Sequence, residues 1–343
     1  MNINGICIDA HSDYALYVYS EYMKGNKNIL KERHLPLLRR GGVNIEILTV
    51  GGDFDFFPEL NSRDPFNIIK IIELIHNEIE ESLDLFTLIK KSRDFEEIKN
   101  NNKIGFLLGL EGAESIEQDL SLLNKYYKLG LRSIGITHNF KNKFAYGCGE
   151  VPAKGLTNLG KNLVEELNNL NILVDLSHIS ESSFWDVLEL IEKPPIATHS
   201  NAKALCNHPR NLSDNQIEAM AEKKGVIGLN FFSLFIDGSA NNATIDKLIN
   251  HIDHMVNVAG INYIGLGPDF INYYVEDSEL VAQNTPKNFG VVDNSEKNLE
   301  ILRDPSELPM FFNRLLKRGY SDREIRKIKG ENFMRVFKKV LKY

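Results

Sequence analysis

Short apolar runs recur along the chain, separated by longer stretches in which apolar residues return every three or four positions. Runs of this length are typical of buried β-strands, and the longer pattern is typical of amphipathic helices. Eight strands are predicted: Ile6–His11, Val43–Val50, Ile104–Leu110, Leu131–Thr137, Ile172–Ser177, Pro195–His199, Val226–Asn230 and Tyr263–Gly267.

The intervening stretches are predicted to be helices: Pro65–Lys91, Ile116–Leu129, Leu156–Leu170, Glu181–Ile191, Asp214–Lys223 and Thr244–Ala259. Gly130, Gly225 and Gly260 follow three of them, where a left-handed cap is favoured, and Ser213 precedes one as an N-cap. Strand and helix alternate, which implies parallel strands. Eight such strands predict an α/β fold, a single (β/α)₈ TIM-type barrel.

Beyond the eighth strand the pattern changes. The polar stretch Val275–Asn298 is predicted to be a loop over the mouth of the barrel. Two more helices, Pro305–Arg318 and Asp322–Leu341, are predicted to make residues 304–343 a C-terminal helical extension. Because 343 residues lie within the range of one such barrel, residues 1–343 are expected to be one domain.

Composition narrows the class of protein. Hydrophobic residues at 43% and charged residues at 25% are typical of a soluble globular chain. A net charge of -7, spread along the chain, argues against nucleic-acid and anionic-membrane partners. Three cysteines without CxxC spacing argue against a disulfide framework and a thiolate metal site. With neither a secretory leader nor a run of about 18 apolar residues, the protein is expected to be cytoplasmic.

Metal-ligand side chains gather at the predicted strand ends, where the active site of this fold lies. They are His11 and Asp13, Glu111, His138, His178, His199 and Asp269. His11 and Asp13 are two residues apart, so both project to the same side of an extended backbone. Glu111 follows an apolar strand, where a charged carboxylate is costly unless it is paired or bound to a metal.

Each residue alone has an alternative interpretation. A lone histidine at a strand end is more often a core residue with its hydrogen bonds made, and Glu111 could pair with an arginine. Taken together, His11, Asp13, Glu111, His178 and His199 provide enough ligands for two ions if one carboxylate is shared. Ligands without thiolate suit a catalytic zinc, although manganese, cobalt or nickel could use the same set. Two such ions about 3.5–4 Å apart can activate a water to hydroxide at neutral pH, which is hydrolytic chemistry.

The ordered motifs resemble those of the membrane dipeptidases of the amidohydrolase superfamily over nearly the whole chain. They are Asp9–Asp13, Gly109–Gly112, Gly135–Asn139, Gly155–Thr157, Asp175–His178, His199–Asn201, His208–Asn211 and Gly267–Phe270. Relatives with a carboxylated-lysine bridge usually begin with HxH, so HxD and Glu111 point away from them. The chain departs from the family pattern at Ala10 and Ser12, in place of glycine and asparagine, and at Ile271-Asn272, in place of Asp-Gly.

The resemblance implies a role for each site residue. His11 and Asp13 are expected to bind one zinc, His178 and His199 the other, and Glu111 to bridge both. His138 is expected to contact the substrate and stabilise the oxyanion. Arg210 is expected to receive the terminal carboxylate of the substrate, a role suited to its fork of donors. Asp269 is expected to pass a proton from the attacking water to the leaving amine.

We therefore predict a zinc-dependent dipeptidase that cleaves small dipeptides through a metal-bridging hydroxide. Two rivals remain: a hydrolase of the same fold acting on another small amide, lactone or ester, and a barrel that binds metal or ligand without turnover. A homodimer is left open, because the family commonly dimerises.

The remaining polar residues are given less specific roles. Asp9 and Asp175 are expected to orient ligands by hydrogen bonds. Five other histidines are expected to be surface or capping residues, with His208 near enough to Arg210 to support it; they are His34, His76, His208, His251 and His254. Trp185 is expected to pack rather than to recognise a ligand.

Overall fold

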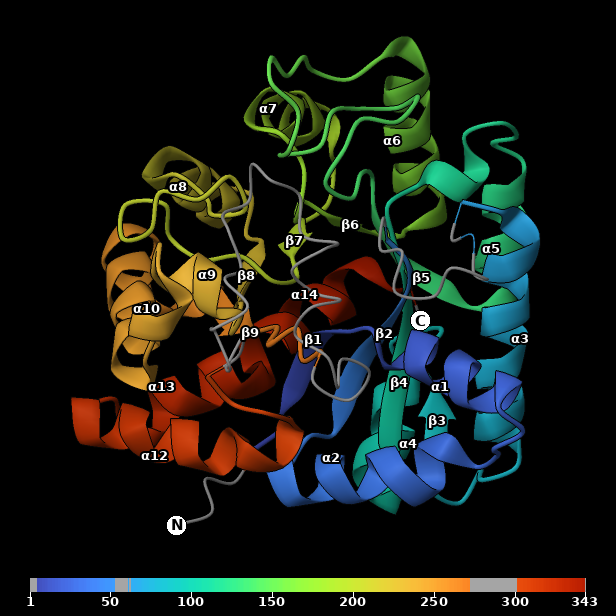
Figure 1. Ribbon diagram of the computed structural model, residues 1–343, viewed down its shortest axis with the longest axis horizontal. Coiled ribbons are helices and arrows are strands. Elements are labelled where there is room, and N and C mark those ends of the chain that lie inside the picture. The colour runs from blue at the N-terminus through green and yellow to red at the C-terminus, as the bar shows by residue number, and fades with distance from the viewer. Residues whose placement is uncertain (1–4, 53–60, 62, 272–300, 343) are drawn as a thin grey trace.

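The computed structural model describes residues 5–52, 61, 63–271 and 301–342. Eight parallel strands form a nearly closed barrel, which confirms the predicted fold class (Figure 1). In spatial order the strands are β1 (Ile8–Ser12), β2 (Ile45–Gly51), β4 (Ile104–Glu111), β5 (Leu131–Gly135), β6 (Leu173–Asp175), β7 (Ile196–Ala197), β8 (Val226–Leu229) and β9 (Ile264–Leu266). The last strand returns to the side of the first, so the carboxyl ends form one rim.

Both faces of these strands are buried, which explains why they appear in the sequence as continuous apolar runs. One layer of side chains fills the barrel, with Ile8, Ile47 and Leu107 among its members. Phe333 and Phe337 of α14 (Asn332–Val340) belong to the same cluster, so the last helix packs against the barrel strands. A larger cluster lies between the strands and the surrounding helices.

The helices between the strands are α1 (Tyr14–Met23), α2 (Leu35–Gly41), α3 (Pro65–Glu80), α4 (Asp94–Asn101), α5 (Leu122–Leu129), α6 (Asn158–Leu170), α7 (Glu181–Leu190), α8 (Asp214–Glu222), α9 (Ser233–Ile236) and α10 (Ile245–Ala259). Figure 1 shows them on the outside of the strands. The predictions for α6, α7, α8 and α10 are confirmed within three residues, and Ser213 caps α8 in a capping box. The predicted set omitted α1, α2, α4 and α9.

The predicted helix Pro65–Lys91 is wrong in its last third. The helix ends at Glu80, a turn through Ser82 follows, and Phe86–Leu88 forms a ninth strand, β3. β3 pairs in parallel with the first half of β4, so that Phe86 lies opposite Ile104. The helical spacing of apolar residues continues through this segment, but its partner strand decides the conformation.

Two other predicted helices are shorter than expected. Ile116–Leu129 is helical only from Leu122, after a separate turn at Glu114–Ile116. The segment Asp322–Leu341 is divided at Gly330 into α13 (Asp322–Arg326) and α14, with a further helical turn between them. A Cβ at Gly330 would lie 2.7 Å from the carbonyl oxygen of Ile6, so this glycine lets the chain approach the start of β1.

The first helix of the C-terminal extension is α12 (Leu308–Arg318), preceded by a helical turn at Pro305–Glu307. The predicted loop Val275–Asn298 lies outside the described residues. Within the described residues, no helix has the length and apolar character to cross a membrane.

Several minor predictions are wrong. Gly130 and Gly260 have positive φ, but after α8 it is Lys224, not Gly225, that does so (φ 60°). His34 is fully buried, 2.6 Å from Glu46 Oε2 and stacked on Tyr14, so it is not a surface residue. It occupies the N-cap position of α2, but its side chain makes no capping hydrogen bond. His251 is also buried, as its hydrogen bonds to two backbone segments require.

Candidate metal centre

The carboxyl ends of five strands bring the side chains of the predicted site residues together at one rim of the barrel. His11 lies within β1 and Asp13 directly follows it, while Glu111 ends β4. His178, His199 and Asp269 lie two or three residues beyond β6, β7 and β9. All six side chains are buried or largely buried. Residues separated by up to 258 positions in the chain (269 − 11 = 258) therefore share one small volume.

Glu111 lies at the centre of this cluster. Its Oε1 is 3.0 Å from His178 Nε2, 3.4 Å from His11 Nε2 and 3.6 Å from His199 Nε2. One carboxylate oxygen thus faces three imidazole nitrogens from three strands. Across the described residues Glu111 forms no ion pair with an arginine, so the alternative of a structural salt bridge is wrong.

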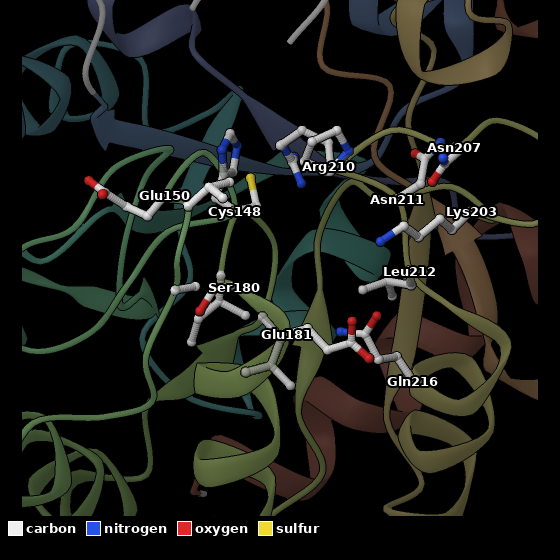
Figure 2. A pocket seen from close by; sticks show the side chains of 16 residues that line it. Cys148, Glu150, Ser180, Glu181, Lys203, Asn207, Arg210, Asn211, Leu212 and Gln216 are labelled. Atoms are coloured by element: carbon white, nitrogen blue, oxygen red, sulfur yellow. The ribbon is translucent and has the colours of Figure 1, made fainter. Parts of the chain in front are cut away.

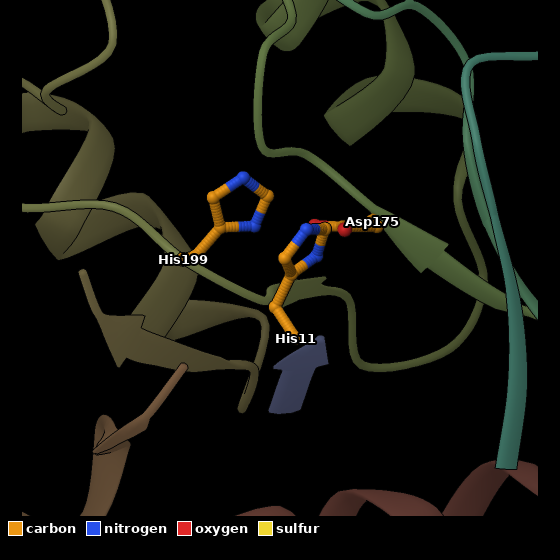
Figure 3. Close-up of side chains that lie close together, drawn as sticks. All are labelled: His11, Asp175 and His199. Carbon is orange, nitrogen blue, oxygen red and sulfur yellow. The ribbon is translucent and has the colours of Figure 1, made fainter. Parts of the chain in front are cut away.

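The imidazoles also face one another. His178 Nε2 and His199 Nε2 are 2.8 Å apart. The His11 and His199 rings lie side by side, with centroids 3.7 Å apart, and Asp175 lies next to them (Figure 3). His178, His199 and Glu111 form one group of ligand atoms that can hold a cation.

A second group of ligand atoms adjoins the first. His11 Nε2 is 3.7 Å from Asp13 Oδ1 and 3.7 Å from Asp269 Oδ1. The Thr49 hydroxyl donates to Asp13 Oδ1 at 2.7 Å, which holds that carboxylate toward His11. The two groups of ligand atoms overlap at His11, so the rim has room for two neighbouring ions.

Hydrogen bonds at Nδ1 orient two of the imidazoles. Asn139 Oδ1 lies 2.8 Å from His178 Nδ1, and the Thr198 hydroxyl lies 2.7 Å from His199 Nδ1. Contacts of this kind leave Nε2 free to bind a metal. Asp175 belongs by distance to a third candidate ligand group, but its Oδ1 accepts from two backbone amides and its Oδ2 from Thr198. We therefore interpret Asp175 as an orienting residue rather than a ligand.

The protonation of the cluster favours bound cations. Burial, with the neighbouring Asp13 and Asp269, raises the pKa of Glu111 well above its usual value, and burial with Asp13 does the same to the pKa of Asp269. Burial lowers the pKa of His11, His178 and His199, which keeps these imidazoles in the neutral form that binds metals. A cation would stabilise the ionised carboxylates without opposing the neutral imidazoles.

Two buried polar atoms in the cluster further test whether these residues fit a metal ion. His11 Nε2 and Glu111 Oε2 have no hydrogen-bond partner among the described residues. Such atoms cost about 1–3 kcal/mol each when they are left unsatisfied. The residues present therefore fit divalent metal ions, and nitrogen and oxygen ligands without thiolate are within the range that zinc accepts.

His178 and Asp269 have backbone φ angles of 63° and 64°, in the left-handed region that residues other than glycine seldom adopt. Both angles occur where the chain leaves a strand and aims a side chain into the cluster. Backbone strain of this kind is concentrated at functional sites. Asn230 donates to Asp269 Oδ2 at 3.1 Å and fixes the second carboxylate oxygen.

His138 and Arg210 border the same cluster. His138 Nε2 lies 4.0 Å from Glu111 Oε2, and the His138 ring packs against His178. Arg210 is buried, donates from Nη2 to the carbonyl oxygen of His199 at 3.0 Å, and has its guanidinium over the Phe235 ring. Its Nε has no hydrogen-bond partner among the described residues, so a donor remains for an anionic ligand.

A cavity of about 480 Å³ opens beside the cluster, with His178 and Arg210 in its wall (Figure 2). Cys148 also lines this cavity. Burial raises the pKa of the Cys148 thiol to about 11, although Arg210 and Lys203 oppose the shift. The thiol therefore stays protonated at neutral pH and is unsuited to bind a metal as a thiolate.

Sequence reasoning missed the residues that orient the ligands and line the cavity: Thr49, Asn139, Thr198, Asn230, Cys148 and Lys203. Asn139 and Thr198 each adjoin a nominated histidine, which was the available signal. Thr49 and Asn230 lie at strand ends, but nothing local marks them as partners of Asp13 and Asp269.

Comparisons with known proteins match most of the chain. The sequence pattern of membrane dipeptidases (peptidase family M19) matches residues 3–283 and 290–343. A protein of Schizosaccharomyces pombe described as an uncharacterized dipeptidase is 31% identical over 354 aligned positions, which cover 96% of this chain and 80% of that protein.

Solved structures share the fold over almost the entire chain. An amidohydrolase from Pseudomonas aeruginosa superposes with a TM-score of 0.82 at 25% identity, covering 99% of this chain and 97% of its own. A metallo peptidase from Rhodobacter sphaeroides, solved with a phosphinate mimic of L-Ala-D-Ala, superposes with a TM-score of 0.81 at 23% identity, covering 98% of this chain and 100% of its own.

Proposed function

Because the chain belongs to the membrane dipeptidase family, a family of metallopeptidases, we propose that it uses two zinc ions to hydrolyse the peptide bond of small dipeptides. The observation that carries the proposal is the convergence of three imidazoles on one carboxylate oxygen of Glu111. The whole chain would act as one catalytic domain, with residues 304–343 as its helical extension.

The ligands divide between two ions. We assign His11 and Asp13 to one, His178 and His199 to the other, and Glu111 to both, in agreement with the distances within the cluster. When bound, the two ions supply Lewis acidity toward the scissile carbonyl and lower the pKa of the attacking water.

The other residues bind the substrate and move protons. Arg210 would take the terminal carboxylate of the dipeptide, because its guanidinium is already oriented by His199 and keeps a spare donor. His138 would donate a hydrogen bond to the carbonyl oxygen as negative charge develops on it. Asp269 would accept a proton from the attacking water and return it to the leaving amine, acting first as general base and then as general acid.

A substrate panel tests the reaction. The zinc-loaded protein is incubated with L,L- and L,D-dipeptides, with N-acyl amino acids and with simple esters, and the released amino acids, carboxylic acids and alcohols are measured by chromatography. The proposal expects hydrolysis that depends on both a free α-amine and a free carboxylate. Preference for N-acyl amino acids or esters would favour the rival hydrolase of the same fold. A fully metal-loaded sample that cleaves none of the compounds would favour a binding protein.

Substitution of Asp269 by alanine tests the assignment of the proton carrier. We expect kcat/KM to fall by about 10²-fold or more, the usual size of general acid-base catalysis, while most of the zinc is retained. Zinc content is measured by atomic emission on the same sample. The control, Glu111→Gln, should lose both zinc and activity. Unchanged turnover in the alanine variant would contradict the role given to Asp269.

A further inference from the structure

Two cations, Arg210 and Lys203, and two carboxylates, Glu150 and Glu181, line the cavity beside the metal cluster. Because Arg210 is assigned to the α-carboxylate of the dipeptide, the charge of Lys203 has no role in the proposed reaction. His178 joins the cavity to the cluster, and Asn207 and Gln216 also line it. Its volume of about 480 Å³ is in the range of small-molecule sites. The cavity is therefore continuous with the proposed reaction centre and large enough for one end of a substrate.

The second cation of the cavity is the Lys203 ammonium group. Figure 2 shows its side chain reaching into the cavity, with Arg210 in the same wall region. Lys203, Arg210 and the Cys148 thiol all line this cavity. Lys203 makes no ion pair with an acidic residue of the described part of the chain, although Glu150 and Glu181 line the same cavity. Its charge is thus available to a ligand.

The backbone holds Lys203 in a defined place. Its amide donates to the carbonyl oxygen of Leu212 at 2.8 Å, and Ala202 forms a bridge with Leu212. Arg210, in the same loop, is held by the carbonyl oxygen of His199. Two cations on one braced loop can bind two carboxylates of a single ligand with little loss of conformational entropy.

We propose that Lys203 makes the enzyme selective for dipeptides whose C-terminal residue has a carboxylate side chain, aspartate or glutamate. The inference rests on the proposed function, because Arg210 must first take the α-carboxylate. The side-chain carboxylate then reaches the Lys203 ammonium and forms a charge-assisted hydrogen bond in a partly desolvated cavity. A neutral side chain of the same shape cannot form that bond.

Matched substrates test this selectivity. For the zinc-loaded protein, kcat/KM is measured for Ala-Asp against Ala-Asn and for Ala-Glu against Ala-Gln. We expect each acidic dipeptide to be preferred about tenfold or more, the size of one charge-assisted hydrogen bond. The difference should lie mainly in KM, since the contact is present before and during the reaction.

Three variants separate recognition from structure. Lys203→Met should reduce the ratio of acidic to neutral kcat/KM to near one, whereas Lys203→Arg should keep most of it. Lys161→Met, an exposed lysine on α6, is the matched control and should leave both the ratio and the basal activity unchanged.

Each outcome decides one of the two proposals. If Ala-Asn and Ala-Gln are hydrolysed but the wild-type protein shows no preference for the acidic partner, the role of Lys203 is wrong and the dipeptidase proposal stands. A preference that survives in Lys203→Met also rejects the role of Lys203. If no dipeptide is cleaved by a fully zinc-loaded sample, the proposed function itself fails.

Discussion

Thr198 illustrates how one hydroxyl group can orient a side chain that we propose as a metal ligand. It lies between the Asp175 carboxylate and His199 Nδ1, and the backbone amide of Thr198 also donates to Asp175. The orientation of the His199 ring therefore depends on a residue that has no ligand atom of its own. Partners of this kind commonly change metal affinity by about 10–100-fold when they are removed.

We predict that Thr198→Val weakens zinc binding by about 10–100-fold with little change in the fold, because valine keeps the shape and loses the hydroxyl. Titration against a chromophoric chelator measures the affinity, and circular dichroism checks the fold. Thr198→Ser, which keeps the hydroxyl, should bind nearly as well as the wild-type protein. Equal affinity in all three proteins would show that Thr198 does not orient His199.

At the scale of elements, buried histidines connect helices to the barrel. His251 of α10 accepts a hydrogen bond at Nδ1 from the Ala202 amide, and its Nε2 donates to the carbonyl oxygen of Ile236 at the end of α9. The contact with Ala202 requires the neutral ring, because Nδ1 can accept a hydrogen bond only when it is unprotonated. Burial lowers the pKa of His251, and the nearby His254 contributes to the shift.

This arrangement predicts a pH-dependent stability. The pKa of His251 in the folded state lies below the value of about 6.5 in the unfolded chain, so the unfolded chain binds the proton first as pH falls. Above about pH 6.5, His251 should make its full contribution to the free energy of unfolding. This contribution should be lost as pH falls through the lower pKa of the folded state. Urea unfolding at a series of pH values measures the slope.

The comparison variant is His251→Gln, which removes the titrating group and should make the slope between pH 6.5 and 5 shallower than in the wild-type protein. Asn257→Gln, at an exposed and non-titrating position of the same helix, is the matched control and should keep the slope of the wild-type protein. An unchanged slope in His251→Gln would mean that other groups, among them the histidines at the rim, account for the dependence.

At the scale of the whole molecule, the metal cluster ties the rim of the barrel together. The proposed ligands come from the ends of β1, β4, β6 and β7, which are distributed around the barrel. Because the unfolded chain cannot bring these residues together, metal binding should add to the free energy of unfolding.

Chelation should therefore lower the thermal midpoint, and zinc should restore it. At a free zinc concentration 100 times the Kd the expected gain is about 2.7 kcal/mol. Differential scanning calorimetry with and without zinc measures the effect. Glu111→Gln, which removes the shared charge, should show little zinc-dependent rise. A wild-type midpoint that does not respond to chelation or to zinc would contradict a metal site of this extent.

The order of elements could be predicted from the sequence because burial on both sides of a barrel strand produces apolar runs, and the helices between them keep their own period. Strand ends were enough to nominate His11, Glu111, His178 and His199, because the carboxyl ends of parallel strands share one rim. The family resemblance added roles for His138, Arg210 and Asp269. Two departures noted from the sequence, Ala10 and Ser12, remove no ligand-type side chain.

Other features were decided only by the tertiary structure, because they depend on contacts between segments that are distant in the sequence. β3 exists because Phe86 pairs with Ile104, and the last helix is divided because Gly330 must pass close to Ile6. The links from Thr49 to Asp13 and from Asn139 to His178 join residues 36 and 39 positions apart, and the cavity at Lys203 is lined by three separate segments of the chain. Local periodicity reports which face of an element is buried, but not which side chain of another element meets it there.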